Sequence, residues 1–302
     1  MLQRDAFIAE IVQALKEGDD IYFLCADFGA FALDELRRDF PKNFVHCGIS
    51  EQNMVDVATG LALEGKKVFC YAMAPFLGMR ALEQIKCGPG IMNLPICFIS
   101  VGVGIGYADS GPTHYATEEF SCLRSIIGIN VFTCADSVTA KKLAQSIINR
   151  PRFSYVRLDR HDLPNVEVDY DCGAYRLIGE ATSLKIALVS HGKLLHTCVQ
   201  LATEAPEKFL VIDLIQSKVF PVDVVKILDK VAGVIAVDEQ SPSGAIGSAI
   251  FEACSDRNVF PKIVNVTLPE KYLFDNIGRE GHLNKYGLSV ANIFEQSKRI
   301  VA

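Results

Sequence analysis

Residues 44–73 read FVHCGISEQNMVDVATGLALEGKKVFCYAM and place a strand, a helix and a second strand in immediate succession. The apolar run FVHCGIS leads into a segment that predicts a helix, with Ser50 as its N-cap and Gly65 at its end. KVFCYAM predicts a buried strand because it is a short, nearly continuous apolar run. This order is typical of a parallel sheet whose two faces are both covered by helices.

The same alternation continues on both sides of this stretch. Before it, residues 4–17 predict a helix and IYFLCAD (21–27) a buried strand; after it, PFLGMRALEQIKCGPG (75–90) predicts a helix that ends at Gly-Pro-Gly. Further on, Ser137 is expected to cap a helix that runs to residue 149.

A polar, turn-rich segment then separates two series of strands and helices. Between about 160 and 185 it predicts a linker with a hairpin-like excursion. We therefore expect an α/β protein of two parallel-sheet α/β domains, the first at 1–165 and the second at 180–302.

Composition excludes several classes of protein. With 302 residues, 50% hydrophobic and 22% charged, the chain is long enough for two domains and too apolar for disorder. A net charge of −6 argues against nucleic acid or an anionic membrane as the main partner. No apolar run is long enough to span a bilayer. The N-terminus MLQRDAFIAEI carries acids where a signal peptide is apolar, so we expect a cytoplasmic protein.

Ligands of such folds bind at the loops that follow the carboxyl ends of strands. The richest of these loops is VGVGIGYADSGPTHY (101–115). Its glycines lack the GxGxxG spacing of a dinucleotide site and are better explained by close approach of the backbone to a neighbour. His114 follows a Gly-Pro turn, which suits proton transfer, although a structural role stays open. Glu51, taken alone, is better explained as a first-turn acid favoured by the helix dipole.

Five stretches resemble the pyrimidine-binding domain of transketolases, and deoxyxylulose-phosphate synthases are similar there. They are HCGISEQNMVDVATGLALEG (46–65), YAMAPFLGMRALEQI (71–85), GPTHYATEEFSCLRSI (111–126), NVFTCAD (130–136) and YVRLDRHDLP (155–164). From KIALVSHG (185–192) to the Leu-Pro at 268–269, the chain resembles the C-terminal domain of the same enzymes. The resemblance covers essentially the whole chain in order.

This resemblance implies thiamine diphosphate as cofactor and assigns roles by position. Glu51 would hydrogen-bond the N1′ atom of the aminopyrimidine and so favour the imino tautomer, a role that suits a buried acid. Phe76 would stack on the pyrimidine ring, although a core phenylalanine is the alternative. Asp27 would lie close to the cofactor, unless it only caps a loop. His114 would contact the hydroxyl and carbonyl oxygens of the reacting substrate.

The resemblance also implies residues that recognise the sugar. Arg4, Arg124 and Arg160 match positions that hold a sugar phosphate in one or another member, with a surface ion pair as the alternative for each. Ser110 stands where the family usually has an aspartate, and the acid Asp109 lies one position earlier. The stereochemistry of the donor is therefore left open.

The family's GDG…N motif, which binds the diphosphate and its Mg²⁺, does not occur in this sequence. We therefore expect the C-terminal subunit of a split transketolase that carries no metal ligands itself. Its partner would be an N-terminal-half subunit that supplies GDG…N and Mg²⁺, in an α₂β₂ assembly around a homodimer core. The substrates would be sugars or sugar phosphates.

Three alternatives stay open at this point: the β subunit of a 2-oxo acid dehydrogenase E1 component, a deoxyxylulose-phosphate synthase-like activity, and a non-catalytic subunit. GPTH and RLDR in this order favour the transketolase interpretation over the first.

Overall fold

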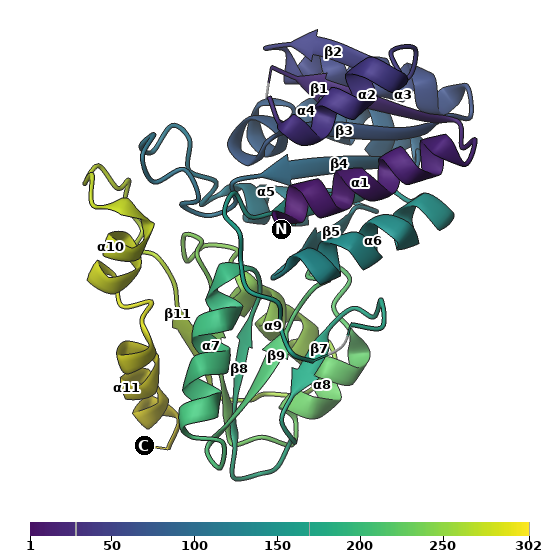
Figure 1. The fold of residues 1–302 in the computed structure, drawn as a ribbon. Coiled ribbons are helices and arrows are strands. Elements are labelled where there is room, and N and C mark those ends of the chain that lie inside the picture. The colour runs from purple at the N-terminus through teal and green to yellow at the C-terminus, as the bar shows by residue number, and fades with distance from the viewer. Residues whose placement is uncertain (28, 169, 302) are drawn as a thin grey trace. The chain divides into compact units, whose positions relative to one another are not determined.

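The computed structural model describes residues 1–27, 29–168 and 170–301 of the chain. It divides into two units (Figure 1). The first unit consists of Met1–Val103 and Cys122–Asn165, and the second of Gly104–Ser121 and Val166–Ala302. The loop that contains GPTH thus belongs to the second unit, although the sequence on both sides of it belongs to the first.

Six parallel strands form the sheet of the first unit, in the order β2-β1-β3-β4-β6-β5. Helices α1 and α6 pack together on one face, and α3 and α4 pack together on the other. The strands are apolar along most of their length because helices cover both faces. From the N-terminus to residue 158 the elements are α1 (Gln3–Lys16), β1 (Ile21–Ala26), η1 (Phe31–Leu33), α2 (Asp34–Asp39), β2 (Phe44–Gly48), α3 (Glu51–Leu63), β3 (Lys67–Met73), η2 (Phe76–Arg80), α4 (Leu82–Ile85), η3 (Lys86–Gly90), β4 (Ile96–Val101), α5 (Glu119–Arg124), β5 (Asn130–Thr133), α6 (Ser137–Asn149) and β6 (Ser154–Leu158).

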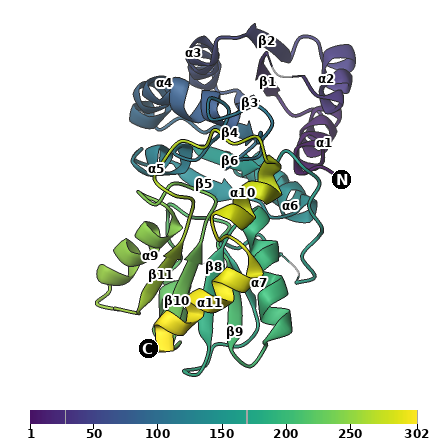
Figure 2. The same cartoon turned by 90° about the vertical axis from the view of Figure 1, so that its left-hand side faces the viewer.

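The second unit contains a five-stranded sheet in the order β11-β10-β8-β9-β7 (Figure 2). Four strands are parallel, whereas β7 pairs antiparallel with β9, so the expectation of a wholly parallel sheet is wrong at this edge. The buried Arg176 on β7 bonds Asp213 on β9 and ties the edge strand to the sheet. The remaining elements are β7 (Arg176–Ile178), β8 (Ile186–Ser190), α7 (Lys193–Glu204), β9 (Phe209–Asp213), α8 (Val222–Leu228), β10 (Gly233–Val237), α9 (Ile246–Ser255), β11 (Ile263–Val266), α10 (Gly278–Lys285) and α11 (Val290–Val301).

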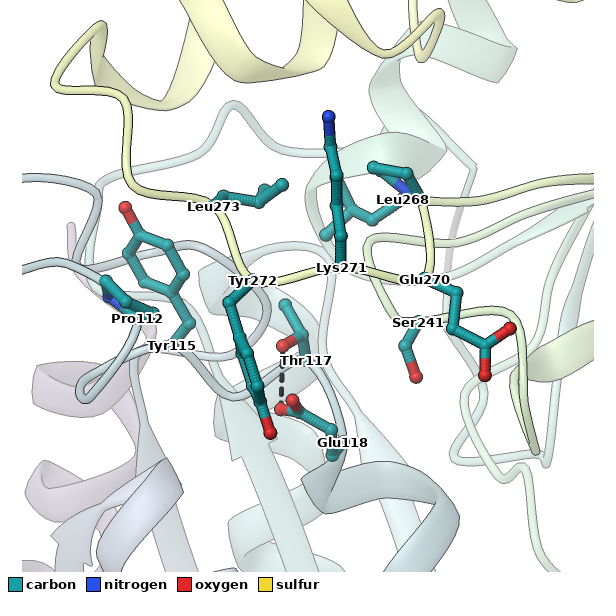
Figure 3. Close-up of a pocket in the computed structure, with 11 residues that line it drawn as sticks. Pro112, Tyr115, Thr117, Glu118, Ser241, Leu268, Glu270, Lys271, Tyr272 and Leu273 are labelled. Carbon is teal, nitrogen blue, oxygen red and sulfur yellow. Dashed lines mark hydrogen bonds between the residues drawn. The ribbon is translucent and has the colours of Figure 1, made fainter.

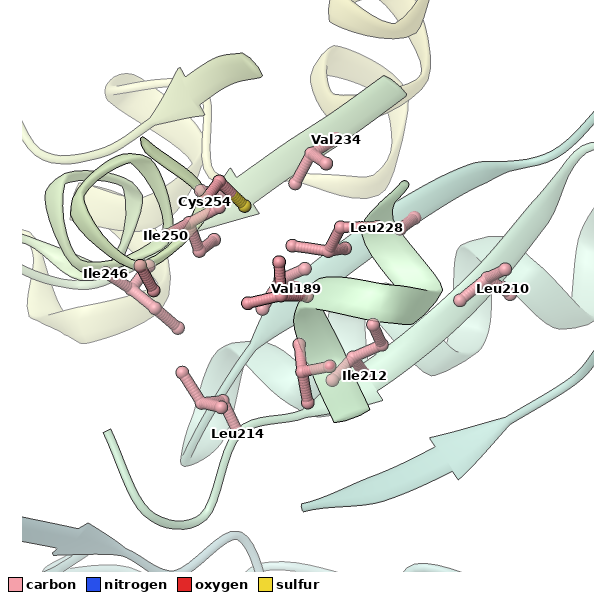
Figure 4. Close-up of a cluster of buried hydrophobic side chains, with 14 residues drawn as sticks. Val189, Leu210, Ile212, Leu214, Leu228, Val234, Ile246, Ile250 and Cys254 are labelled. Carbon is pink, nitrogen blue, oxygen red and sulfur yellow. The ribbon is translucent and has the colours of Figure 1, made fainter. Parts of the chain in front are cut away.

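A hydrophobic core lies between this second sheet and the pair α8 and α9 (Figure 4). Side chains alternate along each strand, so Val189 and Ile212 point into this core together with Leu228 and Ile250 from the helices. Helices α7 and α11 pack together on the opposite face, where Phe209 of β9 lies edge-on to Phe294 of α11.

Three local details differ from the expectations drawn from sequence. Ser50 occupies the N-cap position of α3 as predicted, but its hydroxyl donates to the carbonyl of Cys47 and makes no capping hydrogen bond to the helix. Asp136, and not Ser137, caps α6, and its carboxylate accepts a 2.6 Å bond from the amide of Thr139. Pro89 lies inside a π-helical turn and does not end the helix, because the chain stays helical through residue 92.

Two further findings concern the cysteines and the helices. All ten cysteines are free thiols. Among the described residues, no helix combines the length and the apolar character that crossing a membrane requires.

Candidate functional site

Three of the predicted site residues lie at one edge of the first sheet. Strands β2, β1 and β3 are neighbours and run parallel, so their carboxyl ends lie side by side. Glu51 follows β2, Asp27 follows β1 and Phe76 follows β3. The register between β1 and β2 shifts between Cys25 and Ala26, directly before Asp27. This edge is where ligands of parallel α/β sheets bind.

Glu51 and Phe76 are brought together by a third side chain, Arg80. The Nη1 atom of Arg80 donates to Oε2 of Glu51 at 2.6 Å, and its guanidinium carbon lies 4.4 Å from the centroid of the Phe76 ring. The Glu51 side chain is only 5% exposed, whereas that of Arg80 is 40% exposed. The arginine therefore connects a buried carboxylate to a half-buried aromatic ring.

The local fold explains why Arg80 reaches both groups. Residues 76–80 form a π-helical turn, η2, which accommodates one residue more than an α-helical turn. Arg80 was not among the residues predicted for the site. The signal was a cation that follows the aromatic residue by one helical turn.

Asp27 is exposed and lies beside the similarly exposed His46. The Nε2 atom of His46 lies 3.7 Å from Oδ1 of Asp27, and the Asp27 amide donates to the carbonyl of Gly48. Asp27 thus joins the ends of β1 and β2 through its backbone while its carboxylate remains accessible.

The three arginines predicted to hold a phosphate occupy separate elements of the first unit. Arg4 lies on α1, Arg124 in the last turn of α5, and Arg160 after β6; all three are half-buried. Arg4 pairs with Asp5 at 2.8 Å. Burial is the largest single influence and opposes its charge, but the bond to Asp5 and the charges of Tyr71 and Asp5 together outweigh burial and raise the pKa of Arg4. Arg4 also lines a cavity that includes Arg37.

The loop that carries Asp109, Ser110 and His114 belongs to the second unit. Asp109 and Ser110 are exposed, and His114 is half-buried with its Nδ1 atom 2.9 Å from the Thr113 hydroxyl. Burial, together with the charges of Asp109 and Asp275, raises the pKa of Tyr115. Imidazole is the side chain most often used for proton transfer, so His114 remains the candidate acid–base group of this loop.

A cavity of about 270 Å³ borders the same loop within the second unit (Figure 3). Pro112, Tyr115 and Glu118 line one side, and residues 268–273 line the other. Tyr272 extends towards Glu118, which accepts a 2.7 Å bond from Thr117, whereas Lys271 points away from it. The cavity therefore offers both charge signs and aromatic surface next to His114.

Two further observations concern metal ligands and two of the buried cysteines. Within residues 1–27, 29–168 and 170–301, no three His, Cys, Asp or Glu side chains are grouped so that they could hold a metal ion. Burial raises the pKa of Cys198 to about 12 and that of Cys97 further, so both thiols stay protonated at neutral pH.

Comparison with protein families gives two consecutive matches. Residues 1–166 match the family described as transketolase, pyrimidine binding domain, and residues 180–293 match transketolase, C-terminal domain.

Two curated relatives differ in how much of their length the chain spans. An apulose-4-phosphate transketolase subunit of Phocaeicola vulgatus is 28% identical over 274 residues, which cover 87% of this chain and 86% of the relative. The 1-deoxy-D-xylulose-5-phosphate synthase of Parasynechococcus marenigrum is 28% identical over 249 residues, which cover 79% of this chain but only 38% of the relative.

Among solved structures, a split gene transketolase described as an inactive beta4 tetramer superimposes with a TM-score of 0.86. It is 23% identical, and the match covers 99% of this chain and 98% of the other. At this identity the likeness concerns the fold.

Proposed function

Because the chain belongs to the transketolase family, we propose that it is the C-terminal subunit of a thiamine-diphosphate-dependent enzyme that transfers a two-carbon ketol unit between sugars or sugar phosphates. The observation that carries the proposal is the buried Glu51 beside Phe76 at the carboxyl edge of a pyrimidine-binding domain. We further propose residues 1–165 and 180–302 as the two domains, with the loop Gly104–Ser121 of the first domain lying in the second unit.

The residues of the first unit fit the pyrimidine end of the cofactor. An aminopyrimidine is flat and carries ring nitrogens, so it needs an aromatic surface and a hydrogen-bonding acid. Phe76 and Glu51 offer these two groups, and Asp27 lies after the neighbouring strand. When bound, thiamine diphosphate supplies the carbon nucleophile for ketol transfer. Glu51 would hold the proton at the ring nitrogen, and Phe76 would orient the ring.

The substrate side is assigned to the loop of the second unit. His114 would exchange a proton with the sugar's hydroxyl and carbonyl oxygens, and Asp109 and Ser110 would contact its other hydroxyls. Arg4, Arg124 and Arg160 are the candidates for a substrate phosphate. A relative named for apulose-4-phosphate supports a phosphorylated ketose as the first donor to test.

We propose that a second polypeptide completes the site. It would be an N-terminal-half transketolase subunit that supplies the GDG…N motif and the Mg²⁺ ligands, in an α₂β₂ assembly. The chain spans 86% of a relative that is itself named as one subunit of a transketolase, and its structural neighbour is a split-gene protein in an inactive form. Both support a chain that works only with a partner.

Reconstitution tests the proposal. The purified chain, an N-terminal-half subunit and their mixture are each given thiamine diphosphate, Mg²⁺, a ketose phosphate donor and an aldose acceptor. We expect ketol transfer only from the mixture, and co-elution of the two chains on gel filtration. Transfer by this chain alone, or a mixture that binds together but transfers nothing with any donor, would contradict the proposal.

A further inference from the structure

The loop Gly104–Ser121 is closed at its base by its own backbone. The amide of Ala116 donates to the carbonyl of Gly104 at 2.7 Å, and these two residues form an isolated antiparallel bridge. Within the loop, the Tyr115 hydroxyl donates to the carbonyl of Ala108. His114 lies two residues before the bridge, so its position depends on how the base of the loop is held.

Residues 239–241, which follow strand β10, hold this base at three consecutive positions. Glu239 lies against Gly104, where φ is +60°, and a Cβ atom at residue 104 would clash with the Glu239 carboxylate. The Nε2 atom of Gln240 donates to the Ala116 carbonyl at 2.9 Å. The amide of Ser241 donates to the Thr117 carbonyl at 2.9 Å. We call residues 239–241 the clamp.

The clamp is itself fixed by buried polar groups. Arg279 of α10 binds Glu239 through two parallel hydrogen bonds, from Nε to Oε1 and from Nη2 to Oε2, and both side chains are largely buried. A bidentate pair of this kind fixes both the distance and the orientation of the carboxylate. Gln240 is 2% exposed, so its amide has little access to water as an alternative partner.

Aromatic side chains make further contacts between the loop and the rest of the second unit. Tyr115 meets the ring of His282 edge-on at 6.2 Å, and Phe120 meets His191 edge-on at 5.4 Å. His191 in turn lies 3.0 Å from Asp238, the residue that precedes the clamp. The loop is therefore held at its base and along its side by residues of one unit.

We propose that the clamp fixes the loop that carries His114 and thereby positions the substrate. Glu239 and Gln240 are its positioning residues, because they hold the backbone on either side of His114. The effect on substrate rests on the proposed function, whereas the effect on the loop backbone does not depend on it. Each contact of the clamp described above goes to the backbone of the loop, so the clamp sets where the loop lies and leaves its side chains to choose the substrate. Cofactor residues Glu51 and Phe76 belong to the first unit and are outside its action.

The first test follows the loop backbone in the isolated chain by hydrogen exchange. Gln240→Met keeps the size of the side chain and removes the donor to Ala116, and Gln200→Met is the matched control on the exposed face of α7. We expect the Ala116 and Ser241 amides to exchange about tenfold faster in Gln240→Met only, which corresponds to about 1.4 kcal/mol. Unchanged exchange there, or an equal increase throughout the second unit, would overturn the proposal.

The second test separates positioning from general destabilisation in the complex reconstituted with the partner subunit. We expect Gln240→Met to raise the donor KM about tenfold while the Kd of thiamine diphosphate stays within twofold. A parallel loss of cofactor affinity would overturn a positioning role. If the wild-type complex transfers no ketol unit, the proposed function fails, whereas the exchange result still decides the clamp.

Gly104→Ala provides an independent variant in case Gln240→Met does not fold. It leaves the clamp intact and forces the loop away from Glu239, so we expect the same faster exchange at Ala116 and the same rise in KM. Gly111→Ala is its control, because that glycine also has a positive φ but a Cβ there meets nothing within 4 Å. Equal effects of the two alanines would overturn the proposal.

Discussion

Glutamine in place of Glu51 changes the proposed chemistry while changing the fold little. Glu51→Gln keeps the size of the side chain but replaces a carboxylate whose Oε2 atom lies 2.6 Å from Arg80. Removal of one partner from a fully buried ion pair lowers the free energy of unfolding by about 3–5 kcal/mol. Here the Arg80 side chain is 40% exposed, so water can solvate the guanidinium. We therefore expect the free energy of unfolding to fall by about 1 kcal/mol or less.

The effect on ketol transfer should be larger than this. An amide at residue 51 cannot share the proton of the pyrimidine nitrogen, so kcat of the reconstituted complex should fall more than tenfold, a loss of over about 1.4 kcal/mol in the transition state. Thermal unfolding of the isolated chain and single-donor kinetics of the complex measure the two effects separately. Retention of more than about a tenth of the activity would refute the assignment of Glu51.

Arg80→Met is the matched control, because it breaks the same ion pair and leaves the acid in place. We expect it to lose more stability than Glu51→Gln, because it leaves the buried Glu51 carboxylate unpaired, but clearly less activity. If the two variants lose activity equally, the ion pair is what matters, and the reasoning about the acid is wrong.

Three further predictions concern other parts of the chain. His114→Ala should lower kcat by about 10²–10⁴ with little change in Tm, since the ring is half-buried on a loop; a large fall in Tm at normal kcat would point to a structural role. The isolated chain should show no tight binding of thiamine diphosphate with Mg²⁺ in isothermal titration, and stoichiometric micromolar binding would contradict the split site. Burial raises the pKa of Cys198 from 9.0 to about 12, so its stabilising effect should be complete below about pH 9 and be lost as the pH rises towards 12. At pH 8, iodoacetamide should modify the exposed Cys87 and spare Cys198 until the chain unfolds; modification of Cys198 in the folded chain would show that it is accessible.

The edge that gathers Glu51, Asp27 and Phe76 could be predicted because it depends on short-range patterns. Each residue directly follows an apolar run, and parallel strands bring their carboxyl ends to one edge whatever their order. The sequence did not show that β1 lies between β2 and β3, since strand order depends on packing between distant segments. The resemblance to transketolases supplied the roles, which the residue types alone left open.

Helix caps and turns were harder to predict where adjacent residues could serve the same structural role. Asp136 and Ser137 are both good N-caps and are adjacent, so pattern reasoning could not choose between them. The π turn at residues 76–80 differs from an α-helix by one residue per turn, a difference too small to detect in so short a segment. That turn brings Arg80 to Glu51. Because the π turn could not be predicted, Arg80 could not be predicted as a site residue either.

The glycines of the GPTH loop predicted a close approach of the backbone, which Gly104 makes, but nothing in the sequence identified Glu239 as the neighbour. Gly104 and Ala116 are held by Glu239 and Gln240, more than a hundred residues further along the chain, and neither pair stands out in sequence. Under the proposed roles the two units would have different tasks, because Glu51 belongs to one and His114 to the other. Substitutions at the clamp should therefore alter how donors are recognised while cofactor affinity is kept, whereas substitutions around Arg80 should do the reverse. Under the proposed function, sugar specificity could then change through the second unit without disturbing the residues proposed for the cofactor.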